Sequence, residues 1–214
     1  MMDLFHTFKS GKEEIAKDAY LLRGFALQDS KHLLLADMQA VIKQAPLRYM
    51  MTPMGFAMSA AMTNCGELGW VSNQQGYRYH TLDPSTGKPW PRMPASFLQL
   101  AQTAATECGY TDFIPDTCLI NQYKIGASMG LHQDKNERDF TQPIVSVSLG
   151  IPAVFQFGGL KRSDKTDKIP LNHGDIVVWG GNARLKYHGI MPLKPNNHET
   201  LGAYRYNLTF RKAG

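Results

Sequence analysis

Cysteine is scarce in this sequence. Only Cys65, Cys108 and Cys118 occur among 214 residues, and no two of them are separated by just two residues. An odd number of cysteines without a Cys-x-x-Cys spacing argues against a disulfide framework and against a structural zinc site. We therefore expect a reduced, cytoplasmic protein.

Long apolar runs are also missing. No window approaches the roughly 18 consecutive apolar residues of a membrane span, and residues 1–6 show no basic stretch leading into an apolar one. We expect neither a membrane segment nor a secretory signal. No repeat, low-complexity tract or Pro/Gly/Ser-rich linker divides the chain, so we expect a single domain, residues 1–214, that acts as a monomer.

Charged residues make up only 19% of the chain, with 23 Lys and Arg against 18 Asp and Glu. The resulting net charge of +5 and pI of about 9.1 permit a polyanionic partner such as nucleic acid. The charge does not prove such a partner, because many proteins with this balance bind nothing acidic. Hydrophobic residues, at 43%, suffice for a core.

Helix and strand signals occupy different parts of the sequence. Helical spacing of apolar residues predicts one helix that Asp29-Ser30 would cap and Pro46 would end, and a second from about Ser96 to Gly109. Residues 56–79, between them, are typical of short strands and turns. After residue 115, short β-type runs are separated by Gly, Pro and Asn; these runs are 117–123, 144–149, 153–157, 176–179, 186–190 and 204–210.

Evenly spaced strands without intervening helices indicate an antiparallel sandwich or barrel. We therefore predict a mainly β protein with flanking helices (α+β). Residues 1–115 would form a helix-bearing N-terminal part, and residues 116–214 a β-rich core.

A candidate metal site begins at His132-x-Asp134. On a strand, residues two apart point to the same side, so both side chains can reach one cation. A lone His-x-Asp is common by chance, but His188, on another predicted strand, offers a third ligand. Two His and one carboxylate form the facial triad of non-haem Fe(II) oxygenases, which leaves open positions for co-substrate and O₂.

A second His-x-Asp occurs at His173-Gly174-Asp175. Its glycine and its place just before a predicted strand favour a hairpin turn. This pair also lies close to His188 in the sequence, whereas the ligands of one metal site in a barrel are expected to come from strands that are distant in the sequence. We therefore prefer His132 and Asp134 as ligands.

The run 205–211 alternates strictly between polar and apolar residues. Arg205, Asn207, Thr209 and Arg211 share one side of the predicted strand, and the other side is apolar. A solvated face is the ordinary explanation for such a pattern. Here two arginines follow the metal histidine, and guanidinium groups hold carboxylates by paired hydrogen bonds, so the pattern favours a dicarboxylate such as 2-oxoglutarate.

With these motifs the sequence resembles the AlkB family of Fe(II)/2-oxoglutarate-dependent DNA-repair dioxygenases. The likeness covers nearly the whole chain and is more specific than the triad alone. The segments that carry it are MTNCG (62–66), GW (69–70), LHQDK (131–135), PIVSVSLG (143–150), FQFGGLKR (155–162), GDIVVWGG (174–181) and RYNLTFR (205–211).

The resemblance implies a double-stranded β-helix (jelly-roll) core with an N-terminal nucleotide-recognition lid. It implies oxidative demethylation of 1-methyladenine and 3-methylcytosine in single-stranded or flipped-out DNA and also in RNA, with Fe(II), 2-oxoglutarate and O₂. The implied metal and catalytic residues are His132, Asp134 and His188. The implied 2-oxoglutarate residues are Asn121, Gln122, Tyr123, Arg205, Tyr206, Asn207, Thr209 and Arg211, and the implied substrate residues are Trp70, Tyr77, Arg78, Tyr79, Asn136 and Arg162.

Three questions stay open at this point. Asn136 stands where an acidic residue is expected near the target base, so base preference is undecided. Without the family pattern, Trp70 would be interpreted as a buried aromatic residue of the core. One alternative is a dioxygenase of the same chemistry that acts on a protein or a small molecule, and another is a nucleic-acid-binding module with a relic metal site. The Trp70/Tyr77 pair weighs against the first, and the intact triad weighs against the second.

Overall fold

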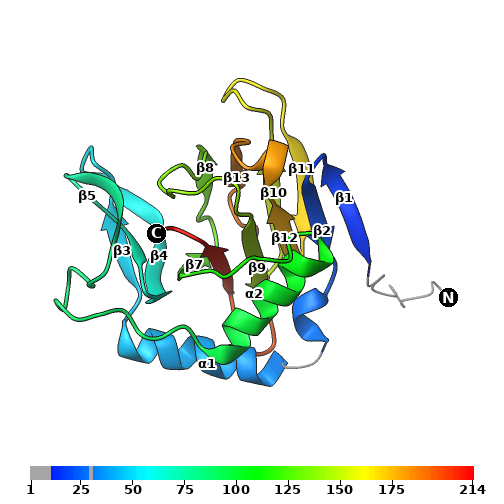
Figure 1. The fold of residues 1–214 in the computed structure, drawn as a ribbon. Helices are drawn as coiled ribbons and strands as arrows, with labels where there is room; N and C mark the ends of the chain where they lie inside the picture. Colours follow the sequence, from blue (N-terminus) through cyan, green and yellow to red (C-terminus); the bar gives the residue numbers. More distant parts are fainter. Residues whose placement is uncertain (1–10, 29–30) are drawn as a thin grey trace.

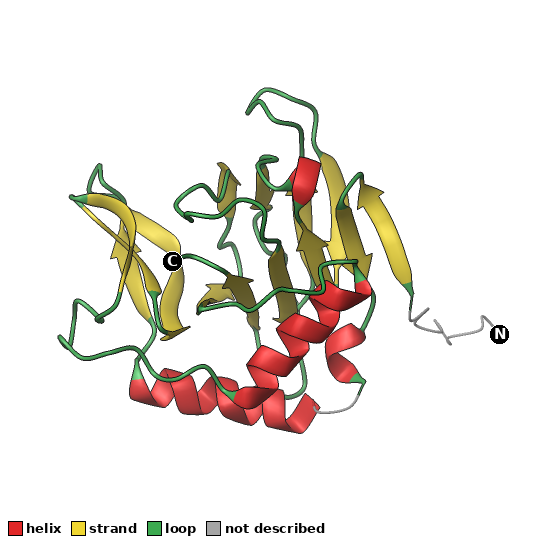
Figure 2. Cartoon of the chain, in the orientation of Figure 1, coloured by secondary structure: helices red, strands yellow, loops and turns green. Residues whose placement is uncertain are grey.

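The computed structural model describes residues 11–28 and 31–214. Its first half mixes helices and strands, which are β1 (Lys12–Ala16), β2 (Ala19–Leu22), η1 (Phe25–Leu27), α1 (Lys31–Gln44), β3 (Arg48–Met51), β4 (Ala57–Gly66), β5 (Gly69–Asn73), β6 (Gly76–His80) and α2 (Ala95–Glu107). The second half is made of strands: β7 (Thr117–Lys124), β8 (Met129–His132), β9 (Ile144–Gly150), β10 (Ala153–Phe157), β11 (Asp167–Leu171), β12 (Ile176–Trp179), β13 (His188–Ile190) and β14 (Tyr204–Arg211), with the short η2 (Gly181–Ala183) before β13. The prediction of a mainly β chain with flanking helices is confirmed (Figure 2).

Two antiparallel sheets form the core. The larger has the order β1-β2-β12-β9-β14-β7-β4-β3, and the smaller β11-β10-β13-β8. From β7 onward the chain passes repeatedly between the two sheets, as in the expected jelly roll (Figure 1). β5 and β6 form a separate hairpin. The larger sheet combines strands from both sides of residue 115, and the division of the chain into lid and core stays a prediction.

The two helices cover the outer face of the larger sheet (Figure 1). Leu34 and Met38 of α1 and Phe97 of α2 are buried there, and the Phe97 ring meets Phe210 of β14 edge-on, with 5.9 Å between centroids. α2 ends as predicted, with Gly109 in the left-handed region at φ 89°. The proposed cap at Asp29-Ser30 lies outside the described residues. Within the described ranges, neither helix is long and apolar enough to cross a membrane.

A second cluster of apolar side chains fills the space between the sheets. Leu119 and Trp179 of the larger sheet pack there with Phe155, Phe157 and Ile190 of the smaller one. The alternation of β14 places its apolar residues Leu208 and Phe210 in the outer, helix-covered cluster. Its polar residues therefore face inward, between the sheets.

Two local predictions are corrected by the structure. β8 ends at His132, so Asp134 lies in the following loop rather than two residues along a strand. The turn at His173-Gly174-Asp175 is not a hairpin, because β11 belongs to the smaller sheet and β12 to the larger. It is instead a crossing between sheets. Asp175, buried in it, accepts hydrogen bonds from the backbone N–H groups of Gly24 and Asn172.

Candidate active site

The three predicted metal ligands converge at the open end of the space between the sheets. His188 of β13 lies directly opposite His132 of β8 in the sheet register, and Asp134 follows β8 after one residue. Their ligand atoms lie within 4.8 Å of one another. Each histidine Nε2 is 3.7 Å from one oxygen of Asp134. Gly189 permits this approach, because a Cβ there would come within 2.6 Å of the Met129 carbonyl oxygen on β8.

Both histidines present Nε2 to the centre. Nδ1 of His132 is 2.9 Å from the Gly130 carbonyl oxygen, and Nδ1 of His188 is 3.0 Å from that of Lys186. A carbonyl only accepts, so each Nδ1 carries the proton and each Nε2 keeps a lone pair for a metal. Burial, reinforced by His188, lowers the pKa of His132 to about 4, so this ring is neutral at neutral pH. Neutral imidazole is the form that binds metal.

Asp134 is kept ionised and oriented by Arg211. Burial alone would raise the pKa of Asp134, but the Arg211 guanidinium outweighs burial and holds the pKa well below its usual range. Nη2 and Nε of Arg211 donate to the same carboxylate oxygen at 2.7 and 3.0 Å. The other oxygen stays available to a cation. Two imidazoles and one carboxylate on one side of a site are the ligand set of Fe(II) oxygenases.

A cavity of about 420 Å³ opens onto the three ligands. One wall is the inner face of the larger sheet. β14 lies between β7 and β9 and places Arg205 opposite Tyr123 and Asn207 opposite Asn121. Among the residues predicted to bind 2-oxoglutarate, the cavity is lined by Asn121, Tyr123, Arg205, Asn207, Thr209 and Arg211.

Arg205 is the deepest cation of this wall and is 1% exposed. Its Nη2 donates to Ser148 Oγ at 2.9 Å, and its guanidinium lies 5.1 Å from the centre of the Tyr123 ring. Nε and Nη1 have no hydrogen-bond partner in the described part of the chain. A buried cation with unused donors is costly unless a ligand completes it. A carboxylate in the cavity would do so, and the site therefore fits a dicarboxylate co-substrate.

The aromatic pair predicted to contact the substrate stands at the mouth of the same cavity. Trp70 of β5 and Tyr77 of β6 stack on each other, with 5.5 Å between centroids and 14° between planes. The indole Nε1 of Trp70 donates to Asn136 Oδ1 at 3.3 Å. Trp70 is only partly buried and lies at the margin of the inner cluster. Trp70, Tyr77, Asn136 and Arg162 all line the cavity.

Four predicted site residues do not reach this cavity. Gln122 and Tyr206 point to the opposite side of the larger sheet, where the Gln122 amide donates to the Tyr206 hydroxyl at 2.6 Å. The reason is the period of two along a strand, since their neighbours in sequence point inward. Arg78 donates to Asn73 within the β5–β6 hairpin, and the Tyr79 hydroxyl donates to Glu137.

Sequence reasoning missed several residues that line the cavity or hold the side chains that do. Trp179 is fully buried beside His188, with 5.0 Å between ring centroids, and Tyr187 precedes that histidine. Ser146 and Ser148 of β9 hold Asn207 and Arg205. The sequence could have indicated the two serines, because they alternate with apolar residues along the predicted strand 144–149 and so share one face of it. In the structure this strand, β9, pairs with β14. Nothing in the sequence indicated Trp179, since a tryptophan ending an apolar strand is normally core.

Comparison with known proteins agrees with the chemistry of this site. The model of the 2OG-Fe(II) oxygenase superfamily matches residues 18–211. The Alpha-ketoglutarate-dependent dioxygenase AlkB of Escherichia coli (strain K12) is 56% identical over 214 residues, which is 100% of this chain and 99% of that protein. The chain belongs to the AlkB family of 2OG-Fe(II) oxygenases. It is thus a dioxygenase that uses Fe(II), 2-oxoglutarate and O₂, in accord with its His-Asp-His centre.

Two further relatives extend the comparison. The Nucleic acid dioxygenase ALKBH1 of Mus musculus is 31% identical over 129 residues, which cover 60% of this chain and 33% of the mouse protein. The solved structure of OsALKBH1 superposes with a TM-score of 0.82 at 27% identity, covering 94% of this chain and 100% of that one. The jelly-roll expectation is therefore confirmed.

Proposed function

We propose that this AlkB-family dioxygenase removes methyl groups from 1-methyladenine and 3-methylcytosine in single-stranded or flipped-out DNA, and also in RNA. The observation that carries the proposal is one cavity that joins the metal ligands, the incompletely bonded Arg205 and the Trp70–Tyr77 wall. Relatives named for nucleic acids support it. The monomeric state and the cytoplasmic location stay predictions.

The inner part of the cavity would hold the metal and the co-substrate. His132, Asp134 and His188 would bind Fe(II), and Nε and Nη1 of Arg205 would hold one carboxylate of 2-oxoglutarate. With O₂ as the oxidant, these groups would supply the oxidation of the N-methyl carbon: one oxygen atom would enter succinate as 2-oxoglutarate loses CO₂, and the other would leave with the methyl carbon as formaldehyde. Arg211 keeps the Asp134 carboxylate charged and in one orientation.

The mouth of the cavity would hold the base. The methylated nitrogen lies on the Watson–Crick edge and is inaccessible within a paired duplex, so the enzyme needs a single strand or an extruded nucleotide. Trp70 offers a flat apolar wall, and the partly exposed ring of His132 lies in the same cavity. Stacking of a base on such a ring contributes roughly 1–3 kcal/mol.

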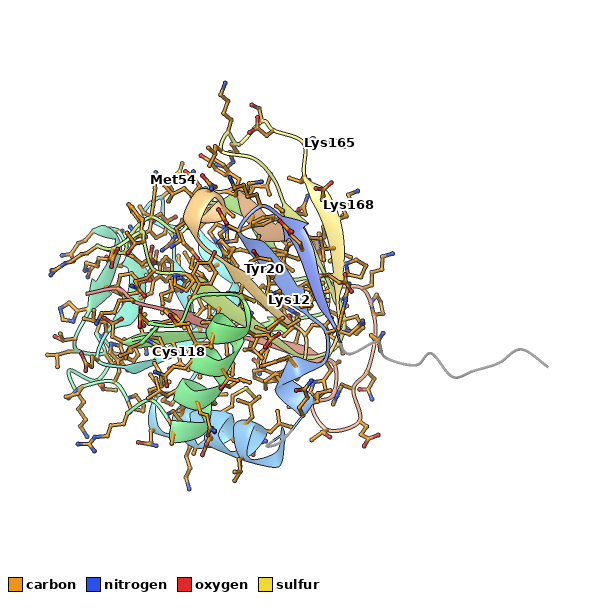
Figure 3. The ribbon with its side chains drawn as sticks, turned by 45° about the vertical axis from the view of Figure 1, so that its right-hand side comes forward. Lys12, Tyr20, Met54, Cys118, Lys165 and Lys168 are labelled. Atoms are coloured by element: carbon orange, nitrogen blue, oxygen red, sulfur yellow. The ribbon has the colours of Figure 1, made fainter. Side chains whose placement is uncertain are left out.

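Basic residues around the mouth suit the phosphates of the strand. Lys135 and Arg162 line the cavity itself. Arg162 belongs to the β10–β11 connection, which Figure 3 shows projecting from the end of the molecule opposite α1, with Lys165 labelled on it and Lys168 labelled on the adjoining strand β11. Each phosphate neutralised by such a side chain should make binding more sensitive to salt.

The test is mass spectrometry of oligonucleotides that carry one 1-methyladenine or one 3-methylcytosine, incubated with the enzyme, Fe(II), 2-oxoglutarate and ascorbate. Loss of one CH₂ from each lesion is expected. The matched control is His188→Ala, which removes one metal ligand. Succinate formation that methylated oligonucleotides fail to stimulate, but a peptide or small molecule does stimulate, would support the protein or small-molecule hydroxylase instead.

A further inference from the structure

One short segment lies between the metal ligands and the hairpin that carries Trp70. It runs from Asp134 to Glu137, directly after β8. Its first residue is a metal ligand, and its last two contact the β5–β6 hairpin. The segment therefore touches both parts of the site at once.

The hairpin side of this connection consists of two hydrogen bonds. Trp70 Nε1 donates to Asn136 Oδ1 at 3.3 Å, and the Tyr79 hydroxyl donates to Glu137 Oε1 at 2.5 Å. Tyr79 is the residue directly opposite Trp70 in the β5–β6 register. Burial raises the pKa of Tyr79, which keeps its hydroxyl protonated and able to donate. Fixing Tyr79 thus fixes the strand pair that presents Trp70.

The metal side is held by two arginines. Arg184 donates through Nη2 to Glu137 Oε2 at 3.0 Å and through Nη1 to the Asp134 carbonyl oxygen at 2.8 Å. Arg211 bonds the Asp134 carboxylate and lies 3.6 Å from Glu137 Oε1. Glu137 therefore shares both of its cationic neighbours with the metal ligand three residues before it.

This network is buried. The side chains of Glu137 and Arg184 are 2% and 3% exposed. A buried charge that loses its partner is strongly disfavoured. Glu137 and Arg184 should therefore not move apart from each other, and a shift of one side chain should shift the other. A displacement of the hairpin would have to be transmitted to the Asp134 backbone, or the network would break.

We propose that Glu137 and Tyr79 are positioning residues that couple the metal centre to the substrate-stacking hairpin. Filling the metal and 2-oxoglutarate sites then tightens nucleic-acid binding, and nucleic acid tightens the combined binding of metal and 2-oxoglutarate by the same factor. The inference rests on the proposed function, because it needs a nucleic acid that binds against Trp70.

The test measures binding without turnover. The dissociation constant of a labelled single-stranded oligonucleotide with one 1-methyladenine is measured by fluorescence anisotropy, anaerobically, with and without Mn(II) plus 2-oxoglutarate. Tyr79→Phe removes only the hydroxyl and Glu137→Gln only the charge. The matched control is Tyr110→Phe, since the Tyr110 hydroxyl donates to the Asp18 carbonyl far from this network.

We expect Mn(II) plus 2-oxoglutarate to tighten oligonucleotide binding about fivefold or more in the unsubstituted protein and in Tyr110→Phe, and less than about twofold in Tyr79→Phe and Glu137→Gln. The Mn(II) affinity, followed by the electron paramagnetic resonance of free Mn(II), should change in parallel when oligonucleotide is added. A purely structural role would lower the melting temperature and leave the ratio unchanged, and that result would overturn the coupling. Failure of the unsubstituted protein to bind the oligonucleotide at all would instead contradict the proposed function, and the coupling with it.

Discussion

Replacing Arg205 should weaken 2-oxoglutarate binding without lowering the stability of the fold. Arg205 is buried, keeps one hydrogen bond to Ser148, and has two nitrogens without partners within the described residues. Arg205→Lys substitutes a single point charge for a fork that can hold a carboxylate by two parallel bonds. The change keeps the positive charge and removes the pair of parallel donors.

The expected magnitude follows from the bonds lost. A hydrogen bond to a charged group contributes about 1.5–3 kcal/mol, so losing one should weaken 2-oxoglutarate binding by roughly 10- to 150-fold. Stability should respond differently. In the protein without co-substrate the guanidinium is an incompletely paired buried cation, so Arg205→Met should leave the melting temperature unchanged or raise it.

The assay is the dependence of succinate formation on 2-oxoglutarate concentration, with the thermal shift caused by 2-oxoglutarate as a second readout. Arg23→Lys is the control, because Arg23 pairs with Glu13 and Asp175 away from the cavity. The reasoning is refuted if Arg205→Lys keeps the wild-type dependence on 2-oxoglutarate. It is equally refuted if Arg205→Met lowers the melting temperature of the protein measured without 2-oxoglutarate.

Three further predictions follow from the site and the core. Alanine at His132, Asp134 or His188 should abolish turnover and Fe(II) binding while circular dichroism shows a folded chain; a variant that kept near-wild-type turnover would remove that residue from the ligand set. Trp70→Ala should weaken oligonucleotide binding by roughly 1–3 kcal/mol and spare decarboxylation of 2-oxoglutarate without substrate, whereas equal losses of both activities and of melting temperature would make Trp70 a core residue. Burial raises the pKa of Cys108 to about 12, so at pH 8 this thiol should react with an aromatic disulfide only after denaturation, and rapid reaction in the native protein would contradict its burial.

Much of the site was predictable because strand alternation is a strong local signal. The polar face of β14 and the ends of α2 follow directly from residue spacing. His132 and His188 were identified by ligand chemistry, and their pairing across β8 and β13 confirms that they converge. Strands β1, β2, β3 and β11 were not predicted. β1 has a largely exposed pattern without alternation; it pairs with β2, which in turn pairs with β12 far along the chain.

The different roles of the two arginines required the tertiary structure. Six residues along a strand span about 20 Å, so Arg205 and Arg211 cannot both close on the same carboxylate. The structure commits Nε and Nη2 of Arg211 to Asp134, whereas Nε and Nη1 of Arg205 have no hydrogen-bond partner within the described residues. The loop position of Asp134 likewise depends on Arg211 and Arg184, which are distant in sequence. Local patterns contain no information on such pairings.

The central claim is that one cavity couples oxidation of 2-oxoglutarate to removal of a methyl group from a nucleic-acid base. The most direct measurement is the ratio of succinate to formaldehyde formed with a single-stranded oligonucleotide carrying 1-methyladenine, compared with the same oligonucleotide without the methyl group. Equal amounts of succinate, formaldehyde and repaired base are expected with the methylated strand, and little succinate with the other. Succinate formation at the same rate with both strands, without formaldehyde, would contradict the claim.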